Sequence, residues 1–291
     1  MKSIAVIVFL GCLAAPAWAQ DSTIPPQPSA TASAPAAEAG FGDTVTIGVA
    51  AVNLPDYEGS NDSRWVPAPA ALGTVHGMAF QVAGNRASID LIPNRPGPTW
   101  DFQLGPVAVV NFNRTSIKSI SDPRIKALGK VGTAIELGGY VGIGKTGVIT
   151  SPYDKLSVSV SYRYDVANGH KSGIVQPSIN YFTPLSRKAG VGIFAGAEHA
   201  GQGYADAYFT VTPAGSIASG LPVYYAHSGW KSYTIGGLAT VALTGDLLHG
   251  FKLFGGGTYK RLMNSFGDSP VVSIAGSRSQ WLGAVGIGYT F

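Results

Sequence analysis

The chain has 291 residues, of which only 12% are charged and 39 are glycine, whereas soluble domains average about 25% charged residues and about 7% glycine. This composition excludes a coiled coil and a soluble helical bundle, and the low charge argues against a largely disordered chain. The net charge of +4 is too dilute for a nucleic-acid-binding surface. After the first fifteen positions no apolar run is long enough to predict a transmembrane helix.

The beginning of the chain predicts an exported protein. Lys2 gives a positive start, an apolar stretch follows over 4–15, and Ala17-Trp18-Ala19 forms a small-x-small cleavage site, so residues 1–19 are expected to be a signal peptide. The single cysteine, Cys12, lies in this segment, which predicts a mature chain without disulfides. Residues 20–40 are rich in proline, alanine and serine and predict a flexible tail. A barrel domain is expected over residues 41–291.

From Asp43 onward, apolar and polar residues alternate along long segments. Within residues 157–166 the apolar and aromatic side chains occupy every second position, and serines, Arg163 and Asp165 occupy the others. Residues 100–113, 131–143 and 251–260 show the same period of two, which half-buried strands require. Globular strands usually have about five or six residues, whereas a tilted strand that crosses a bilayer needs about 9–11 plus its ends. The long segments therefore favour membrane-crossing strands.

Aromatic residues and the end of the chain support the same interpretation. Trp100 and Phe112 lie at the two ends of one apolar row, as in the aromatic girdles of membrane barrels. The final residues alternate up to Phe291 and resemble the C-terminal signature by which the outer-membrane assembly machinery recognises barrel proteins. A closed barrel also pairs every backbone polar group, as lipid demands. We expect a location in the outer membrane of a Gram-negative bacterium, in contact with its lipid.

The predicted fold is all-β, a transmembrane antiparallel up-and-down β-barrel of about twelve strands, with ten or fourteen left open. The candidate strands are 43–53, 64–83 (one strand or two), 86–93, 100–113, 131–144, 155–166, 172–184, 188–199, 203–211, 229–243, 250–262 and 277–291. Taking 64–83 as one strand gives twelve, and single-chain bacterial barrels normally have an even number. The inward positions are mostly small, which fits either a filled interior or a thin water path.

The sequence contains few candidates for catalytic, cofactor-binding or metal-binding residues. Residues 139–146 match the phosphate-binding pattern G-x-x-x-x-G-K-[ST], but they continue a predicted strand, and no helix can begin after them. The five histidines lie far apart, without metal-ligand spacing. We therefore predict no catalytic, cofactor-binding or metal-binding residues, and a barrel enzyme is the weakest of the functional alternatives.

Four charged residues fall on inward positions of the predicted strands: Glu136, Arg163, Asp165 and Glu198. They could line a pore. Ion pairs buried inside the barrel are the preferred interpretation, because an unpaired interior charge is costly.

Three loops carry specific strings of residues. Residues 55–60 read Pro-Asp-Tyr-Glu-Gly-Ser, residues 219–224 read Ser-Gly-Leu-Pro-Val-Tyr, and residues 267–272 read Gly-Asp-Ser-Pro-Val-Val. In this order, ahead of a Gly-x-Gly-Tyr-x-Phe end, they resemble the MipA/OmpV family of outer-membrane proteins over residues 43–291. The residues that carry the resemblance are Pro55, Tyr57, Gly59, Ser60, Ser219, Gly220, Leu221, Pro222, Tyr224, Asp268, Ser269 and Pro270. Asn264 and Phe209-Thr210 depart from the family pattern.

The resemblance implies a non-enzymatic role in the cell envelope. Members of the family are described as scaffolds that bring a lytic murein transglycosylase together with a murein synthase. Other members are described as porin-like or as adhesive surface proteins, and a narrow channel and an adhesin remain alternatives. The family supplies no catalytic residues to transfer to this chain.

One connection is a candidate for docking a soluble enzyme. If both chain ends are periplasmic, the predicted strands place residues 114–130 on the periplasmic side, where turns are normally short. This connection has 17 residues and carries Asp122, Arg124, Lys126 and Lys130. A plug or a simple rim loop is an alternative, and one miscounted strand would move the connection to the cell exterior.

Overall fold

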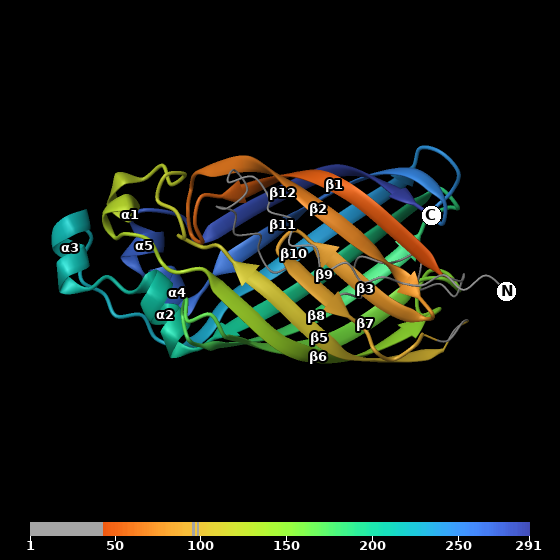
Figure 1. The fold of residues 1–291 in the computed structure, drawn as a ribbon, viewed down its shortest axis with the longest axis horizontal. Coiled ribbons are helices and arrows are strands. Elements are labelled where there is room, and N and C mark those ends of the chain that lie inside the picture. The colour runs from red at the N-terminus through yellow and green to blue at the C-terminus, as the bar shows by residue number, and fades with distance from the viewer. Residues whose placement is uncertain (1–42, 95–96, 98) are drawn as a thin grey trace.

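The computed structural model describes residues 43–94, 97 and 99–291. The predicted signal peptide and the tail over 20–40 lie outside these residues. Twelve antiparallel strands form one closed barrel (Figure 1). They are β1 (Thr44–Pro55), β2 (Ser63–Val75), β3 (Met78–Ala83), β4 (Arg86–Ile89), β5 (Trp100–Asn111), β6 (Ala134–Thr146), β7 (Lys155–Asp165), β8 (Gly173–Pro184), β9 (Ala189–Ala200), β10 (Gly229–Ala242), β11 (Gly250–Leu262) and β12 (Ser279–Thr290). The barrel closes where β1 pairs with β12.

The predicted count of twelve strands is confirmed, but two errors in the predicted strands offset each other. Residues 64–83 form two strands, β2 and β3, which are joined by a turn at His76 and Gly77 with φ angles of 52° and 80°. Positive φ at both central residues is typical of the type I′ turn that twists with a hairpin. Residues 203–211, predicted as a strand, form a helix instead, and the predicted strand 86–93 shortens to β4.

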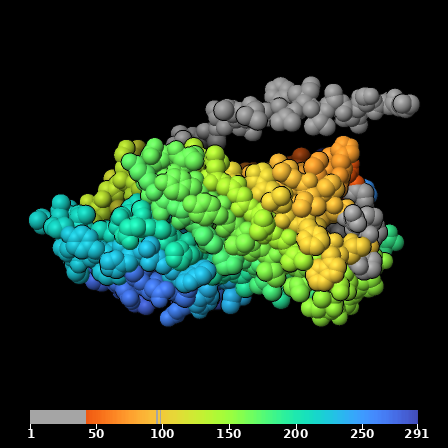
Figure 2. All heavy atoms as spheres, turned by 90° about the horizontal axis from the view of Figure 1, so that it is seen from below, coloured from red at the N-terminus to blue at the C-terminus, as the bar shows by residue number. Residues whose placement is uncertain are grey.

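Five short helices lie in the connections at one end of the barrel, and the C-terminus lies at the other end (Figure 1). They are α1 (Pro123–Ala127), α2 (Gln202–Phe209), α3 (Pro213–Ser219), α4 (Asn264–Asp268) and α5 (Pro270–Ser273). We call the end with the helices the cap end and the opposite end the open end. The cap consists of residues 56–62, 112–133, 201–228 and 263–278. Figure 2 shows its teal and blue parts together at one end of the wall. None of the helices among the described residues is long and apolar enough to cross a membrane.

The wall of the barrel is apolar outside and polar or small inside. Along β7, Val158, Val160 and Tyr162 are exposed, while Ser157 and Ser159 between them are buried, so the predicted alternation of this segment is confirmed. Leu104, Ile193 and Ile235 on other strands are likewise at least half exposed. Apolar side chains pointing out of a closed sheet are what a lipid-facing wall requires. The core of the molecule therefore lies in two places, the lumen and the cap.

Candidate functional site

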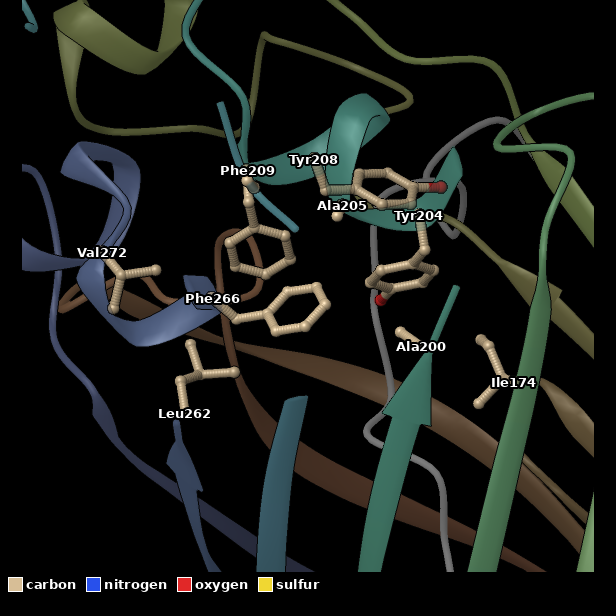
Figure 3. Packing of buried hydrophobic residues seen from close by; sticks show 10 residues of the cluster. Ile174, Ala200, Tyr204, Ala205, Tyr208, Phe209, Leu262, Phe266 and Val272 are labelled. Atoms are coloured by element: carbon tan, nitrogen blue, oxygen red, sulfur yellow. The ribbon is translucent and has the colours of Figure 1, made fainter. Parts of the chain in front are cut away.

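The cap has its own hydrophobic core, built by connections that are far apart in the sequence. Tyr204, Tyr208 and Phe209 of α2 pack against Phe266 of α4 and Val272 of α5, directly above the strand ends (Figure 3). The rings of Phe209 and Phe266 meet edge to face with centroids 5.1 Å apart, a favoured geometry for aromatic pairs. A second cluster joins Tyr57, Ile120, Ile125, Leu221 and Val271. The cap is thus a packed body.

The family-motif residues of the β1–β2 and β11–β12 connections hold the cap together. The buried hydroxyl of Tyr57 lies 2.7 Å from the carbonyl oxygen of Ala275, to which it donates. Gly59 has a φ of 105°, and the backbone oxygen of Ser60 accepts from the Gln280 amide at 2.9 Å. Pro55 is the last residue of β1.

The remaining motif residues act in the same way around α3, α4 and α5. Ser269 donates to the Phe209 carbonyl at 2.5 Å, and Tyr224 donates to the Ser265 carbonyl at 2.8 Å. Leu221 is buried, whereas Pro222 is exposed. Ser219 ends α3 and Gly220 caps it, Pro270 begins α5, and Asp268 pairs with Arg278 at the surface. The motifs are therefore an architectural signature of the cap.

The candidate docking loop is part of this cap, whereas the predicted strands placed it at the same end of the barrel as the C-terminus. Residues 112–133 lie at the cap end, opposite the C-terminus (Figure 1). The error follows from residues 203–211, because removing one strand between the loop and the C-terminus moves the loop to the other end. Asp122 caps α1 by accepting from the Arg124 backbone N–H at 2.7 Å and also forms an ion pair with the Arg124 side chain at 2.6 Å. Lys126 and Lys130 are exposed.

Beneath the cap, a network of buried charges crosses the lumen. Glu58, from the β1–β2 connection, forms ion pairs with Lys231 of β10 at 2.9 Å and with Lys260 of β11. The Tyr204 hydroxyl donates to the second oxygen of Glu58 at 2.6 Å. Burial acts to raise the pKa of Glu58, but Lys231 and Lys260 outweigh it and lower the pKa to about 2. Burial and the Glu58 charge raise the pKa of Tyr204 well above its usual range, so its hydroxyl stays a donor.

The network continues to the opposite wall through Glu198 and Arg163. Glu198 of β9 forms an ion pair with Lys231 at 2.9 Å and accepts a hydrogen bond from Arg163 of β7 at 2.6 Å. Arg163 also donates to Glu136 of β6 at 2.5 Å, and Glu136 lies 3.2 Å from His170. The predicted ion pairing of Glu136, Arg163 and Glu198 is what the structure shows. Each of these side chains is buried, and each has a partner of opposite charge, as burial demands.

Asp165, the fourth predicted lumenal charge, has a different role. Its carboxylate accepts from the backbone N–H groups of His170 at 2.7 Å and Lys171 at 2.9 Å, and also from those of Ile135 and Ala167. It therefore shapes the β7–β8 turn under the cap.

Five residues that were not predicted as site residues from the sequence complete the network: Glu58, Lys231, Lys260, Tyr204 and Arg86. Arg86 of β4 is buried and donates to Gln176 at 3.0 Å, and Gln176 also accepts from Arg163 at 2.8 Å. The inward position of Lys260 was visible in the alternation of 251–260. Nothing in the sequence places Glu58, a loop residue, in the lumen.

Residues of the described strands and connections line two cavities in the lumen. One, of about 50 Å³, lies within the charge network and is lined by Glu58, Glu136, Arg163 and Tyr204 among others. A cavity needs about 10–15 Å³ to hold one water molecule, so this cavity has room for a few waters. The other, of about 160 Å³, lies toward the open end and has a mostly apolar lining. In the described part of the chain no cluster of three or more His, Cys, Asp or Glu side chains is arranged to hold a metal ion.

Comparison with known proteins gives a family match over most of the chain. The model of the family described as MltA-interacting protein MipA matches residues 47–291. None of the curated proteins matches this sequence. Among solved structures, the chain is similar to the Pseudomonas putida toluene transporter TodX, with a TM-score of 0.36, 9% identity, and coverage of 93% of this chain and 95% of that one. It is also similar to the outer membrane channel DcaP of Acinetobacter baumannii, with a TM-score of 0.37, 7% identity, and coverage of 87% and 100%.

Proposed function

Because the chain belongs to the family described as MltA-interacting protein MipA, we propose that it is a non-enzymatic interaction protein of the Gram-negative outer membrane. In this role it is a scaffold for murein-remodelling enzymes, with a lytic murein transglycosylase and a murein synthase as partners. The exposed apolar wall supports the membrane location, since an ionised residue facing mid-bilayer costs about 2–4 kcal/mol.

The observation that carries this proposal is the closure of the lumen. The chain of contacts from Glu58 through Lys231, Glu198 and Arg163 to Glu136 joins opposite walls of the barrel, and the packed cap covers it. A barrel filled in this way has no wide aqueous path for an open pore, so contacts with other proteins fall to its surfaces.

The lengths of the connections support one orientation in the membrane. In outer-membrane barrels the periplasmic turns are short and the outer loops are long. The open-end connections include 76–77 and 185–188, whereas the cap-end connections include 112–133 and 201–228. We therefore place the open end in the periplasm, where a murein enzyme would meet the exposed Arg187 and Lys188 of the β8–β9 turn.

Binding to purified enzymes tests the scaffold. The barrel in lipid nanodiscs is immobilised and offered a lytic murein transglycosylase and a murein synthase from the same organism. Wild type should retain both, and changing Arg187 and Lys188 to serine should weaken retention. Changing Lys126 and Lys130 to serine is the matched control at the cap end. If only the control variant loses binding, the docking surface is the loop predicted from the sequence; if wild type retains neither enzyme, the scaffold is wrong.

Cysteine labelling tests the orientation separately. The only cysteine of the chain, Cys12, lies in the predicted signal peptide, so a new cysteine is a unique label site. A membrane-impermeant maleimide should label Lys126→Cys in intact cells and Ser186→Cys only after the outer membrane is opened. The reverse pattern would place the cap in the periplasm.

A narrow channel is the second candidate, favoured by the two cavities. They adjoin along β12, because Leu282 lines the smaller one and Ala284 the larger one. A rearrangement of the charge network would be needed to join them into a path. A channel of this kind would allow small sugars to swell liposomes that contain the protein.

A further inference from the structure

The larger lumenal cavity is a chamber with an apolar wall. Its volume is about 160 Å³, and it is lined by Ala50 and Val52 of β1, Leu238 of β10, Phe254 of β11 and Ala284 of β12. Thr44 and Thr290, the first residue of β1 and the last of β12, also line it. The chamber therefore extends from mid-barrel to the open end. An apolar cavity of about 150 Å³ is known to hold one benzene molecule.

Glycine positions shape this chamber around the ring of Phe254. A Cβ atom on Gly286 would lie 2.5 Å from the Phe254 ring, and one on Gly48 would lie 3.3 Å from it. Gly286 belongs to β12 and Gly48 belongs to β1, which is the neighbouring strand. The wall thus keeps space for an inward aromatic ring on one side of the chamber.

One cation, Lys252 of β11, faces this apolar space. It is only 7% exposed, lines the chamber, and donates from Nζ to the backbone carbonyl of Leu247. Among the described residues no carboxylate lies within ion-pair distance of it. The other buried lumenal lysines differ: Lys155 pairs with Asp101 at 2.7 Å, and Lys231 has two glutamate partners. Asp246, in the adjoining turn, accepts from the Leu248 backbone and faces Arg187.

A buried cation with only a carbonyl partner is an incomplete arrangement. Burial of a charge is costly unless it is paired, and a carbonyl dipole compensates less than an opposite charge does. An anion at Lys252 would supply the missing charge, while the apolar wall would take up a hydrophobic body. A neutral apolar molecule would leave Lys252 without an opposite charge. A fully polar anion would leave the apolar wall in contact with water.

We propose that the chamber binds a small amphipathic monoanion from the open-end side. Its carboxylate pairs with Lys252, and its apolar body, about the size of a benzene ring, packs against Leu238, Phe254 and Ala284. The charge network closes the chamber toward the cap, so the ligand occupies a blind pocket. This binding is independent of the proposed scaffold role, because it uses the lumen and not the surface.

The test uses 4-fluorobenzoate as the probe and 4-fluorobenzyl alcohol as its neutral counterpart. The wild-type barrel in lipid nanodiscs is titrated, and fluorine NMR line broadening measures binding. The benzoate should bind at least tenfold more tightly than the alcohol. Lys252→Met should lower benzoate affinity at least tenfold without changing alcohol affinity, and Ala284→Phe should remove both by filling the chamber. Lys188→Met, at an exposed lysine of the same end, is the matched control and should bind as wild type does.

A second measurement needs no variant. Photolysis of 4-azidobenzoate on the wild-type barrel should label peptides of β10, β11 and β12 that line the chamber, and excess 4-fluorobenzoate should prevent the labelling. Labelling confined to the outer wall, or benzoate affinity unchanged in a folded Lys252→Met barrel, would overturn the proposal.

Discussion

Tyr204 of α2 donates a hydrogen bond to Glu58 at 2.6 Å across 146 positions of sequence, and its hydroxyl accepts from Lys231 at 3.1 Å. This side chain belongs to the hydrophobic core of the cap and also to the charge network of the lumen. This buried hydroxyl is therefore one of the contacts that join the cap to the barrel, and the stability of each depends on the other.

Removing that hydroxyl should destabilise the protein. Tyr204→Phe leaves the ring in place but takes a buried hydrogen bond from the Glu58 carboxylate, which should lower the free energy of unfolding by about 1–3 kcal/mol. Tyr208→Phe is the matched control, because the buried Tyr208 hydroxyl has no hydrogen-bond partner within the described residues and its loss should change little. Urea unfolding in lipid vesicles measures both. Equal effects of the two substitutions would argue against the link.

Arg163 should matter far more than an exposed arginine. Arg163→Met leaves Glu136 and Glu198 without this cation in a buried site, and breaking a buried pair costs about 3–5 kcal/mol. Arg187→Met removes a pair with Asp246 at 3.6 Å in which the arginine side chain is 92% exposed, so its cost should be close to zero. Unfolding midpoints of the two variants compare them directly. A stable Arg163→Met barrel would mean that the network contributes little.

Gly59 should tolerate a side chain less well than Gly129. Both have positive φ, 105° and 81°, so alanine at either position is strained by about 1–3 kcal/mol. A Cβ on Gly59 would also lie 2.7 Å from Val272 Cγ2, whereas a Cβ on Gly129 meets nothing within 4 Å. Gly59→Ala should therefore unfold at lower urea concentration than Gly129→Ala. A smaller effect at Gly59 would contradict the tight packing of the β1–β2 connection on α5.

The stability of the protein should fall in acid through Glu58. Its pKa is lowered from 4.5 to about 2 in the folded protein, so the folded state binds this proton less readily than the unfolded state does. The stabilisation is present above pH 4.5 and is lost as the pH falls from 4.5 toward 2; a shift of this size corresponds to on the order of 3 kcal/mol. Glu58→Gln should flatten the pH dependence in this window, measured by urea unfolding between pH 7 and pH 3. An unchanged slope would show that other carboxyls dominate.

The wall of the barrel was predictable from local pattern, because a strand between lipid and lumen must alternate its side chains. Residues 157–166 show this, and Glu136, Arg163 and Glu198 were recognised as inward charges in the same way. The helix α2 was not predicted, because Tyr204 and Tyr208 are four positions apart, a spacing that puts two side chains on one face of a strand as well as on one face of a helix. So short a stretch does not distinguish the two periods.

The rest of the site depends on contacts that only the closed fold creates. Glu58 and Lys260 are separated by 202 positions and meet because barrel closure pairs β1 with β12, which in turn pairs with β11. Side chains in a loop do not alternate with a fixed period, so the sequence pattern could not show that the Glu58 carboxylate points into the lumen. The side of residues 112–133 depends on every strand that follows, so the single error at 203–211 reversed it.

Single-channel recording in a planar bilayer measures whether the charge network closes the lumen to ions, so that contacts with partner proteins fall to the surfaces of the barrel. Wild-type protein, shown to be inserted and folded, should give no stable conductance steps in concentrated potassium chloride. Reproducible steps from wild type, altered in size by Arg163→Ala, would contradict a closed barrel and favour a channel.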